Sequence, residues 1–130
     1  LGRAAEAETF VKAADDALGT SRGVLLSHPL VFESGPLRNE VIPELNGALA
    51  EFRATEVPKG AADVAAEVDG AVSYLIDEVS VMADKADAGA SYEFSFGSKY
   101  DDARQAVRYL ATQIDGDTAE ALDRVAGDEP

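Results

Sequence analysis

The sequence predicts an all-α protein, an antiparallel up-down four-helix bundle built as a single domain over residues 1–130. Apolar residues recur at intervals of three and four along most of the chain, which is the period of a helix with one buried face. The connections between these stretches are short and contain Pro and Gly. The longest periodic stretch, residues 61–88, would span roughly 40 Å as a helix, so only helices of similar length could cover it. We expect helices at roughly residues 4–28, 36–55, 60–88 and 98–126.

The first expected helix, residues 4–28, contains two glycines that weaken it. Gly19 and Gly23 each cost about 1 kcal/mol relative to Ala in a helix interior, so we expect one long helix that is softened or interrupted around residues 19–21. Pro29 should end the helix, because the residue before a proline is pushed out of the α region. The apolar start of residues 30–35 suggests a plug over one end of the core.

The second expected helix, residues 36–55, begins with a proline and also contains one. Pro36 suits a first helical turn. Pro43 removes a backbone hydrogen bond, so the helix should be kinked there or shortened to begin near Ile42. The residues expected to face the core are Leu37, Val41, Leu45, Leu49 and Phe52.

The third expected helix, residues 60–88, carries the longest apolar stripe, and Gly89 should end it. Its inward residues are expected to be Ala61, Val64, Ala65, Val68, Val72, Leu75, Ile76, Val79, Met82 and Ala86.

Residues 90–97 alternate aromatic and polar side chains with the period of a strand, but the chain offers no second strand. We therefore expect an extended loop whose aromatic residues pack to one side. Ser98 should cap the fourth helix. The seam of that helix should consist of Tyr100, Ala103, Val107, Leu110 and Ile114.

The charge balance is the most unusual property of the chain. Asp and Glu total 25 against 11 Lys and Arg, for a formal net charge of -14. Such a surface repels phosphate backbones and anionic headgroups, which argues against nucleic-acid partners and against attraction to anionic membranes. Cations, basic proteins or ligands held in an apolar pocket remain as partners. The acidity is compatible with a high-salt environment and equally with the alanine-rich, lysine-poor usage of a GC-rich genome.

Few residues suit catalysis or metal binding. There is no cysteine, which removes disulfides, thiolate metal sites and cysteine nucleophiles. His28 is the single histidine and lacks the Glu-x-x-His spacing of di-iron bundles. No nucleophile or phosphate-loop motif is present. We therefore expect no enzyme activity, no metal and no cofactor.

Four residues are the strongest candidates for ligand binding. Arg104 and Arg108 lie one helical turn apart and could clamp a carboxylate or another anion, although such arginines more often pair with acids of a neighbouring helix. Tyr74 could present a hydroxyl inside the bundle. His28 could bind a ligand or sense pH, or simply favour the end of a helix dipole.

Two classes of function fit these observations. The first is a non-enzymatic extracytoplasmic domain for ligand sensing or protein interaction, the soluble part of an anchored lipoprotein or sensor. The start at Leu1 rather than Met is what a trimmed mature form or an excised domain would show. The second is a small acidic cytoplasmic regulatory protein that binds a basic protein. No stretch reaches the roughly 20 apolar residues of a membrane span, and the chain should be a monomer or a homodimer.

Overall fold

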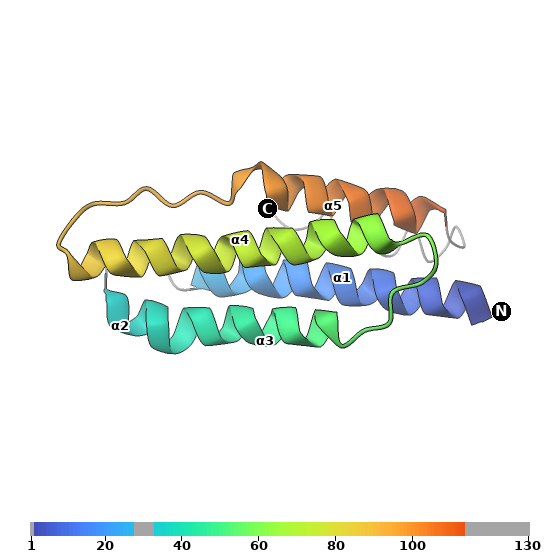
Figure 1. Ribbon diagram of the computed structural model, residues 1–130, viewed down its shortest axis with the longest axis horizontal. Coiled ribbons are helices and arrows are strands. Elements are labelled where there is room, and N and C mark those ends of the chain that lie inside the picture. Colours follow the sequence, from blue (N-terminus) through green and yellow to red (C-terminus); the bar gives the residue numbers. More distant parts are fainter. Residues whose placement is uncertain (1, 28–32, 114–130) are drawn as a thin grey trace.

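A computed structural model describes residues 2–27 and 33–113, and within these residues the protein is entirely helical, with four helices and no strand (Figure 1). The first helix is α1, Gly2–Ser27. The second consists of three consecutive segments, α2 (Ser34–Pro36), the π-helical η1 (Leu37–Val41) and α3 (Ile42–Arg53). The third is α4, Ala62–Asp87, and the fourth is α5, Gly97–Thr112. The all-α prediction is confirmed, and the arrangement is consistent with a helical bundle. Most of the expected end plug, residues 30–35, lies outside the described residues. The part of the fourth expected helix beyond residue 113 lies entirely outside them.

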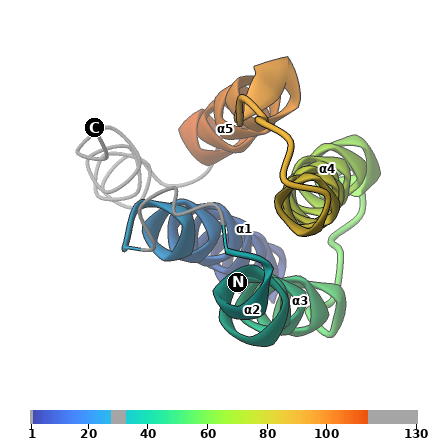
Figure 2. The ribbon, with the colours of Figure 1, turned by 90° about the vertical axis from the view of Figure 1, so that its left-hand side faces the viewer.

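The helices lie around a common centre, as the end-on view shows (Figure 2), and their buried apolar side chains form one core. α1 packs against α3 and α5, and α4 packs against the same two helices. All five residues expected to face inward from the second helix are buried. From α4 the fully or almost fully buried residues are Val68, Ala71, Val72, Leu75, Val79, Met82 and Ala83. None of the helices in residues 2–27 and 33–113 is long and apolar enough to cross a membrane.

The second helix contains its irregular turn just before Pro43. The Ile42 N–H donates to the Leu37 carbonyl, five residues back instead of four. Pro43 has no N–H to give and stands in the first turn of α3, where a missing donor is tolerated. Apolar residues spaced every four positions drift around the axis of an ideal α-helix, which has about 3.6 residues per turn. The wider π turn offsets this drift and helps to keep Leu37 and Val41 on the buried face.

The first expected helix is one long helix, as predicted, with no interruption near Gly19, whereas the predicted cap at Ser98 is wrong. α1 is continuous through Gly19 and Gly23, and the buried Ser21 hydroxyl donates to the Ala17 carbonyl at 2.7 Å within an unbroken turn. Packing of the flanking residues onto the core outweighs the weak glycine propensity. Ser98 does not cap α5 either, because the helix begins at Gly97. At this end of the helix, the Ser95 hydroxyl oxygen accepts a hydrogen bond from the Gly97 N–H at 3.1 Å.

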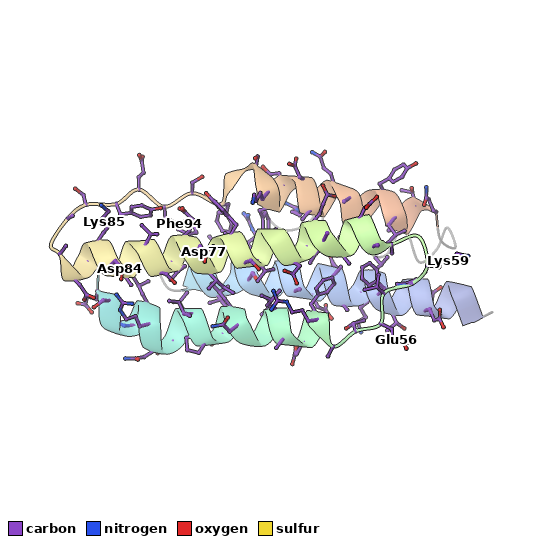
Figure 3. All side chains as sticks on the ribbon, viewed as in Figure 1. Glu56, Lys59, Asp77, Asp84, Lys85 and Phe94 are labelled. Atoms are coloured by element: carbon purple, nitrogen blue, oxygen red, sulfur yellow. The ribbon has the colours of Figure 1, made fainter. Side chains whose placement is uncertain are left out.

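α4 ends as expected at Gly89, whose φ of 70° is suited to glycine. The Gly89 N–H donates to Ala86 and the Ala90 N–H to Lys85, at 3.1 and 2.9 Å. From there residues 88–96, which we call the strap, run as an extended segment beside the C-terminal half of α4 (Figure 1). Phe94 lies on this strap (Figure 3). The strap is an extended loop without strand pairing, as predicted.

Ion pairs join the second helix to α4 at two places. Arg38 of η1 donates to Asp84 and Asp87 at 2.6 and 2.9 Å. Hydrogen bonds from the Ser34 hydroxyl and from Arg38 lower the pKa of Asp87. Arg53 of α3 makes a bidentate pair with Asp69, at 2.6 and 3.0 Å. All of these groups are substantially solvent-exposed, so they hold helix positions with small energies.

Candidate functional site

Three of the four residues predicted to bind a ligand lie in the described part of the chain. Arg104 and Arg108 are both half-buried on α5, one turn apart. Tyr74 of α4 packs against Gly97 at the start of α5, about 10 Å back along that helix from Arg104. His28 lies outside the described residues. Tyr74 therefore lies beside the start of α5, whereas the arginine pair stands further along that helix, and the carboxylate clamp stays a prediction.

The strap and the first turns of α5 form an aromatic cluster, and Tyr74 packs against Gly97, which lies between Phe96 and the rest of α5 in sequence. Phe96 contacts Phe94 and Tyr100, with ring centroids 5.5 and 5.2 Å apart. The guanidinium of Arg22 on α1 lies 5.5 Å from the Phe96 ring centroid, within the range of a cation–π interaction.

The hydroxyls at the two ends of this cluster have partners inside the protein. Tyr100 donates to the Leu18 carbonyl of α1 at 3.1 Å. Tyr92 donates to Glu78 at 2.7 Å, and this bond, together with burial and the Glu78 charge, raises the pKa of Tyr92 to about 12. The cluster thus closes the bundle between α1, α4 and α5, which is a packing role.

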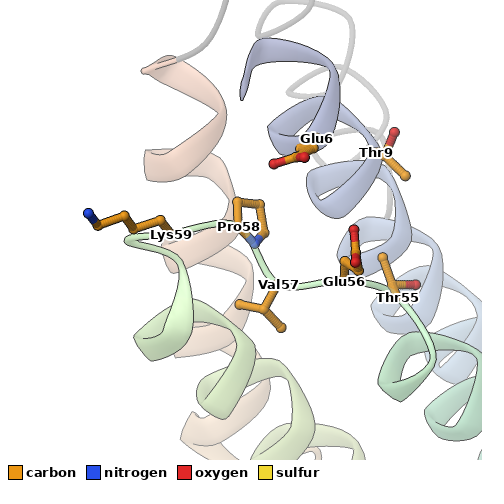
Figure 4. Close-up of a pocket in the computed structure, with 7 residues that line it drawn as sticks. All are labelled: Glu6, Thr9, Thr55, Glu56, Val57, Pro58 and Lys59. Atoms are coloured by element: carbon orange, nitrogen blue, oxygen red, sulfur yellow. The ribbon is translucent and has the colours of Figure 1, made fainter. Parts of the chain in front are cut away.

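A candidate binding cleft lies near the end of the bundle where α1 begins (Figure 1). It is an open cleft of about 530 Å³ between the first turns of α1 and the loop that joins α3 to α4. Glu6 and Thr9 come from α1, and the remaining lining comes from residues 55–59 (Figure 4). Figure 3 shows that Glu56 and Lys59 lie at the end of the molecule opposite Asp84 and Lys85.

The loop that forms one wall of this cleft is held in a defined conformation. The Thr55 N–H donates to the Phe52 carbonyl and the Ala61 N–H to the Pro58 carbonyl, both at 3.0 Å. Gly60 adopts φ 92° and turns the chain into α4. Ala61 is buried in the core. The wall is therefore largely preformed, as most binding sites are.

The acidic and basic side chains of the cleft point in different directions. In Figure 4 the carboxylates of Glu6 and Glu56 point into the space between α1 and the loop, whereas Lys59 points away from it. Val57, a large apolar residue with 47% of its surface exposed, and Pro58 add an apolar part to the wall. The cleft thus combines negative charge with a small apolar surface.

Two shallower grooves run along the sides of the bundle. One of about 250 Å³ lies between α4 and α5, where Gly70 leaves open space beside Lys99 and Asp102. The other, of about 210 Å³, lies between α1 and α3 and is lined in part by Ala13, Ala17 and Ala48. Both are smaller than ordinary ligand pockets.

Within the residues that the structure describes, no group of three or more His, Asp or Glu side chains could hold a metal ion. Comparison with known proteins gave no match to a family model, to a curated protein or to a solved structure.

The sequence analysis did not find the cleft residues. Glu6 and Glu56 are separated by fifty positions, and neither stands in a recognisable motif. The one feature of the sequence that could have indicated the cleft is Val57, an apolar residue in a polar turn between helices. An apolar residue in such a turn is explained either by burial of the turn or by a binding surface.

Proposed function

We propose that this protein is a non-enzymatic helical-bundle domain that binds a ligand or a protein group in the cleft at the α3–α4 loop. We place it outside the cytoplasm, as the soluble part of an anchored lipoprotein or of a sensor. The observation that carries the proposal is the cleft itself, whose volume of about 530 Å³ falls within the roughly 300–1,000 Å³ of small-molecule sites.

The scaffold of the proposal is an antiparallel up-down bundle with a second helix bent near Pro43. The chain directions in Figure 1 support the alternation. So do the ion pairs, because the partner on α4 moves backward from Asp84 to Asp69 as the second helix advances from Arg38 to Arg53. The π turn directly before Pro43 supports the bend, since proline and π turns are the usual causes of kinks.

A second candidate is a small acidic cytoplasmic regulatory protein that binds a basic partner. The observation that favours it is the exposed acidic surface of α4 and α5, in a chain of net charge -14. Acidic residues exposed on these two helices include Asp63, Glu67, Asp77, Asp84, Asp101 and Asp102.

Backbone amide NMR of the full chain, titrated with a panel of cationic, neutral and anionic small molecules, tests the proposal. We expect at least one compound to shift the amides of residues 6–9 and 55–59 in a saturable manner while most others stay unmoved. A ligand that binds only the folded state adds about 2.7 kcal/mol at a hundred times its dissociation constant, so a melting-temperature rise should accompany the shifts. If no compound perturbs the cleft and a basic protein instead shifts the amides of α4 and α5, the second candidate replaces the first.

The cellular location is tested separately. Fractionation of cells that express the full-length gene product should recover the first candidate outside the cytoplasm. Recovery in the cytoplasm would contradict that part of the proposal and favour the regulatory protein.

A further inference from the structure

We propose that the cleft binds a primary ammonium or guanidinium group carried on an aliphatic stem. This inference rests on the proposed binding function and adds the chemical class of the ligand.

The sign of the charge is the first step of the argument. The two carboxylates that point into the cleft come from separate elements, Glu6 from α1 and Glu56 from the loop (Figure 4). The lysine of the cleft wall, Lys59, points away. The nearest preceding basic residue in the chain, Arg53, makes its bidentate pair with Asp69 of α4. A cation entering the cleft therefore meets two carboxylates, and the net charge of -14 adds a long-range attraction.

The number and type of oxygen atoms favour an organic cation over a metal ion. Calcium requires six to eight oxygen ligands, and magnesium a near-ideal octahedron. Across residues 2–27 and 33–113, no set of three acidic or histidine side chains is gathered in a way that could hold a metal. An ammonium has three donors and a guanidinium five. Two carboxylates can accept from either one, and the bidentate geometry suits a guanidinium.

The apolar part of the wall accounts for the stem. Val57 keeps 47% of its surface exposed at the cleft, beside Pro58. An aliphatic chain laid against these residues removes apolar surface from water, which is favourable. A bare inorganic ion gains nothing from such a contact, whereas an alkylamine or the side chain of a lysine or arginine does.

The test is a set of NMR titrations of the full chain at fixed ionic strength, near 0.15 M salt, so that general attraction to the acidic surface is screened beyond about 8 Å. The probes are n-butylamine, n-butylguanidine, the neutral n-butanol, the anionic butyrate and Mg²⁺. We expect the two cationic probes to shift the amides of residues 6–9 and 55–59, with dissociation constants at least tenfold lower than those of the other three.

Two double variants with equal charge provide the control. Glu6→Gln combined with Glu56→Gln keeps the shape of the cleft and should weaken butylamine binding at least tenfold. Glu40→Gln combined with Glu93→Gln removes two exposed acids elsewhere, from η1 and the strap, and should weaken it less than twofold. Equal weakening in the two variants would show general attraction and overturn the inference. All four residues are exposed, so the variants should fold, which their amide spectra will confirm.

The outcomes separate the inference from the function beneath it. If butanol or butyrate binds the cleft as tightly as butylamine, the cationic ligand is wrong while the binding function stands. If Mg²⁺ binds there more tightly than butylamine, the inference that the ligand is an organic cation is wrong. If no probe and no compound of the wider panel shifts the cleft amides, both proposals fail. Spermidine and a short lysine-containing peptide, compared in the same assay, then tell whether the group belongs to a small molecule or to a protein.

Discussion

At the residue scale, Gly97 is constrained both by its backbone conformation and by a close neighbour. Its φ is 75°, and a Cβ atom at this position would lie 2.8 Å from Tyr74 Cε2. Gly60 also has positive φ, 92°, but open space around it. We expect Gly97→Ala to lower the free energy of unfolding by roughly 1–3 kcal/mol, since a non-glycine residue is strained there and Tyr74 must shift. Urea unfolding followed by circular dichroism measures the change.

Two glycine variants separate the causes of that loss. Gly60→Ala isolates the backbone strain and should cost less than Gly97→Ala, because it displaces no side chain. Gly47→Ala in α3, an exposed helical position with nothing within 4 Å, should stabilise the protein by about 0.5–1 kcal/mol. If all three variants had the same stability as the original protein, the Tyr74–Gly97 contact would not be a feature of the fold in solution.

Asp69 gives a prediction on pH. The hydrogen bonds from Arg53, together with its charge and the Ser73 hydroxyl, lower the pKa of Asp69 below the ordinary value of 3.8, although partial burial opposes them. A carboxylate with a lowered folded-state pKa contributes stability above its unfolded pKa, and that stability is lost as the pH falls through the folded pKa. We therefore expect Asp69→Asn to cost under about 1 kcal/mol at pH 7, and the difference from the original protein to vanish well below pH 4.

Urea unfolding of both proteins between pH 7 and pH 2 measures this difference directly, and other titrating groups cancel in it. Asp63→Asn, an exposed acid of the same helix, serves as the control and should show a smaller difference at neutral pH. A difference for Asp69→Asn that grows as the pH falls would show that the Arg53 pair does not stabilise the folded state.

At the element scale, the strap takes the place of a helix beside the C-terminal half of α4. Phe96 anchors it, because this side chain contacts Phe94, Tyr100 and Arg22. We expect Phe96→Ala to destabilise the protein by roughly 2–3 kcal/mol, less than a fully buried Phe→Ala change because Phe96 is half-buried. Hydrogen exchange should show faster exchange in the strap and in the first turn of α5.

The exposed strap residue Glu93 provides the comparison, since Glu93→Ala should change stability by no more than about 0.5 kcal/mol. Equal effects of the two variants would mean that the strap is not held by its aromatic residues.

The elements also show what the sequence could and could not predict. The four apolar repeats identified the helices because each repeat covers several turns. All five core residues predicted for the second helix are buried, although the buried Ala48 was missed. The π turn could not be predicted, because Pro43 is compatible with a kink, a break or a shifted register, and the packing of Leu37 and Val41 decides among them. The start of α5 was missed by one residue, since Ser98 offered a good cap but Gly97 is held against Tyr74 across the bundle.

At the scale of the whole molecule, the candidate site depends on tertiary proximity. Nothing local in Glu6 indicates that it lines the same cleft as Glu56, because the two residues come together only once α1 lies beside the end of α3. The predicted clamp of Arg104 and Arg108 was a local pattern on one helix, and local patterns are what a single sequence shows. The cleft follows from the lengths of the helices and from the loop between α3 and α4, which the sequence predicts only within a few residues.

The net charge of -14 gives the last prediction, which concerns the stability of the whole fold in salt. Self-repulsion destabilises a compact, highly charged state, while the exposed ion pairs of Arg38 and Arg53 contribute little to stability. Salt screens both, but unlike the ion pairs the repulsion involves most of the 25 acidic residues. We therefore expect the melting temperature to rise by several degrees between about 0.01 M and 1 M salt, as the Debye length falls from about 30 to 3 Å.

Calorimetry in NaCl, KCl and choline chloride measures this rise and distinguishes its causes. Screening depends on ionic strength alone, so the three salts should give the same curve, and the curve should flatten near 1 M, where the Debye length is about 3 Å. A rise with one cation only would indicate a specific ion site, and a fall with all three would mean that the ion pairs outweigh the repulsion. A rise that continues well beyond 1 M exceeds what screening can supply. It would favour adaptation to high salt over base composition of the genome as the reason for the acidic surface.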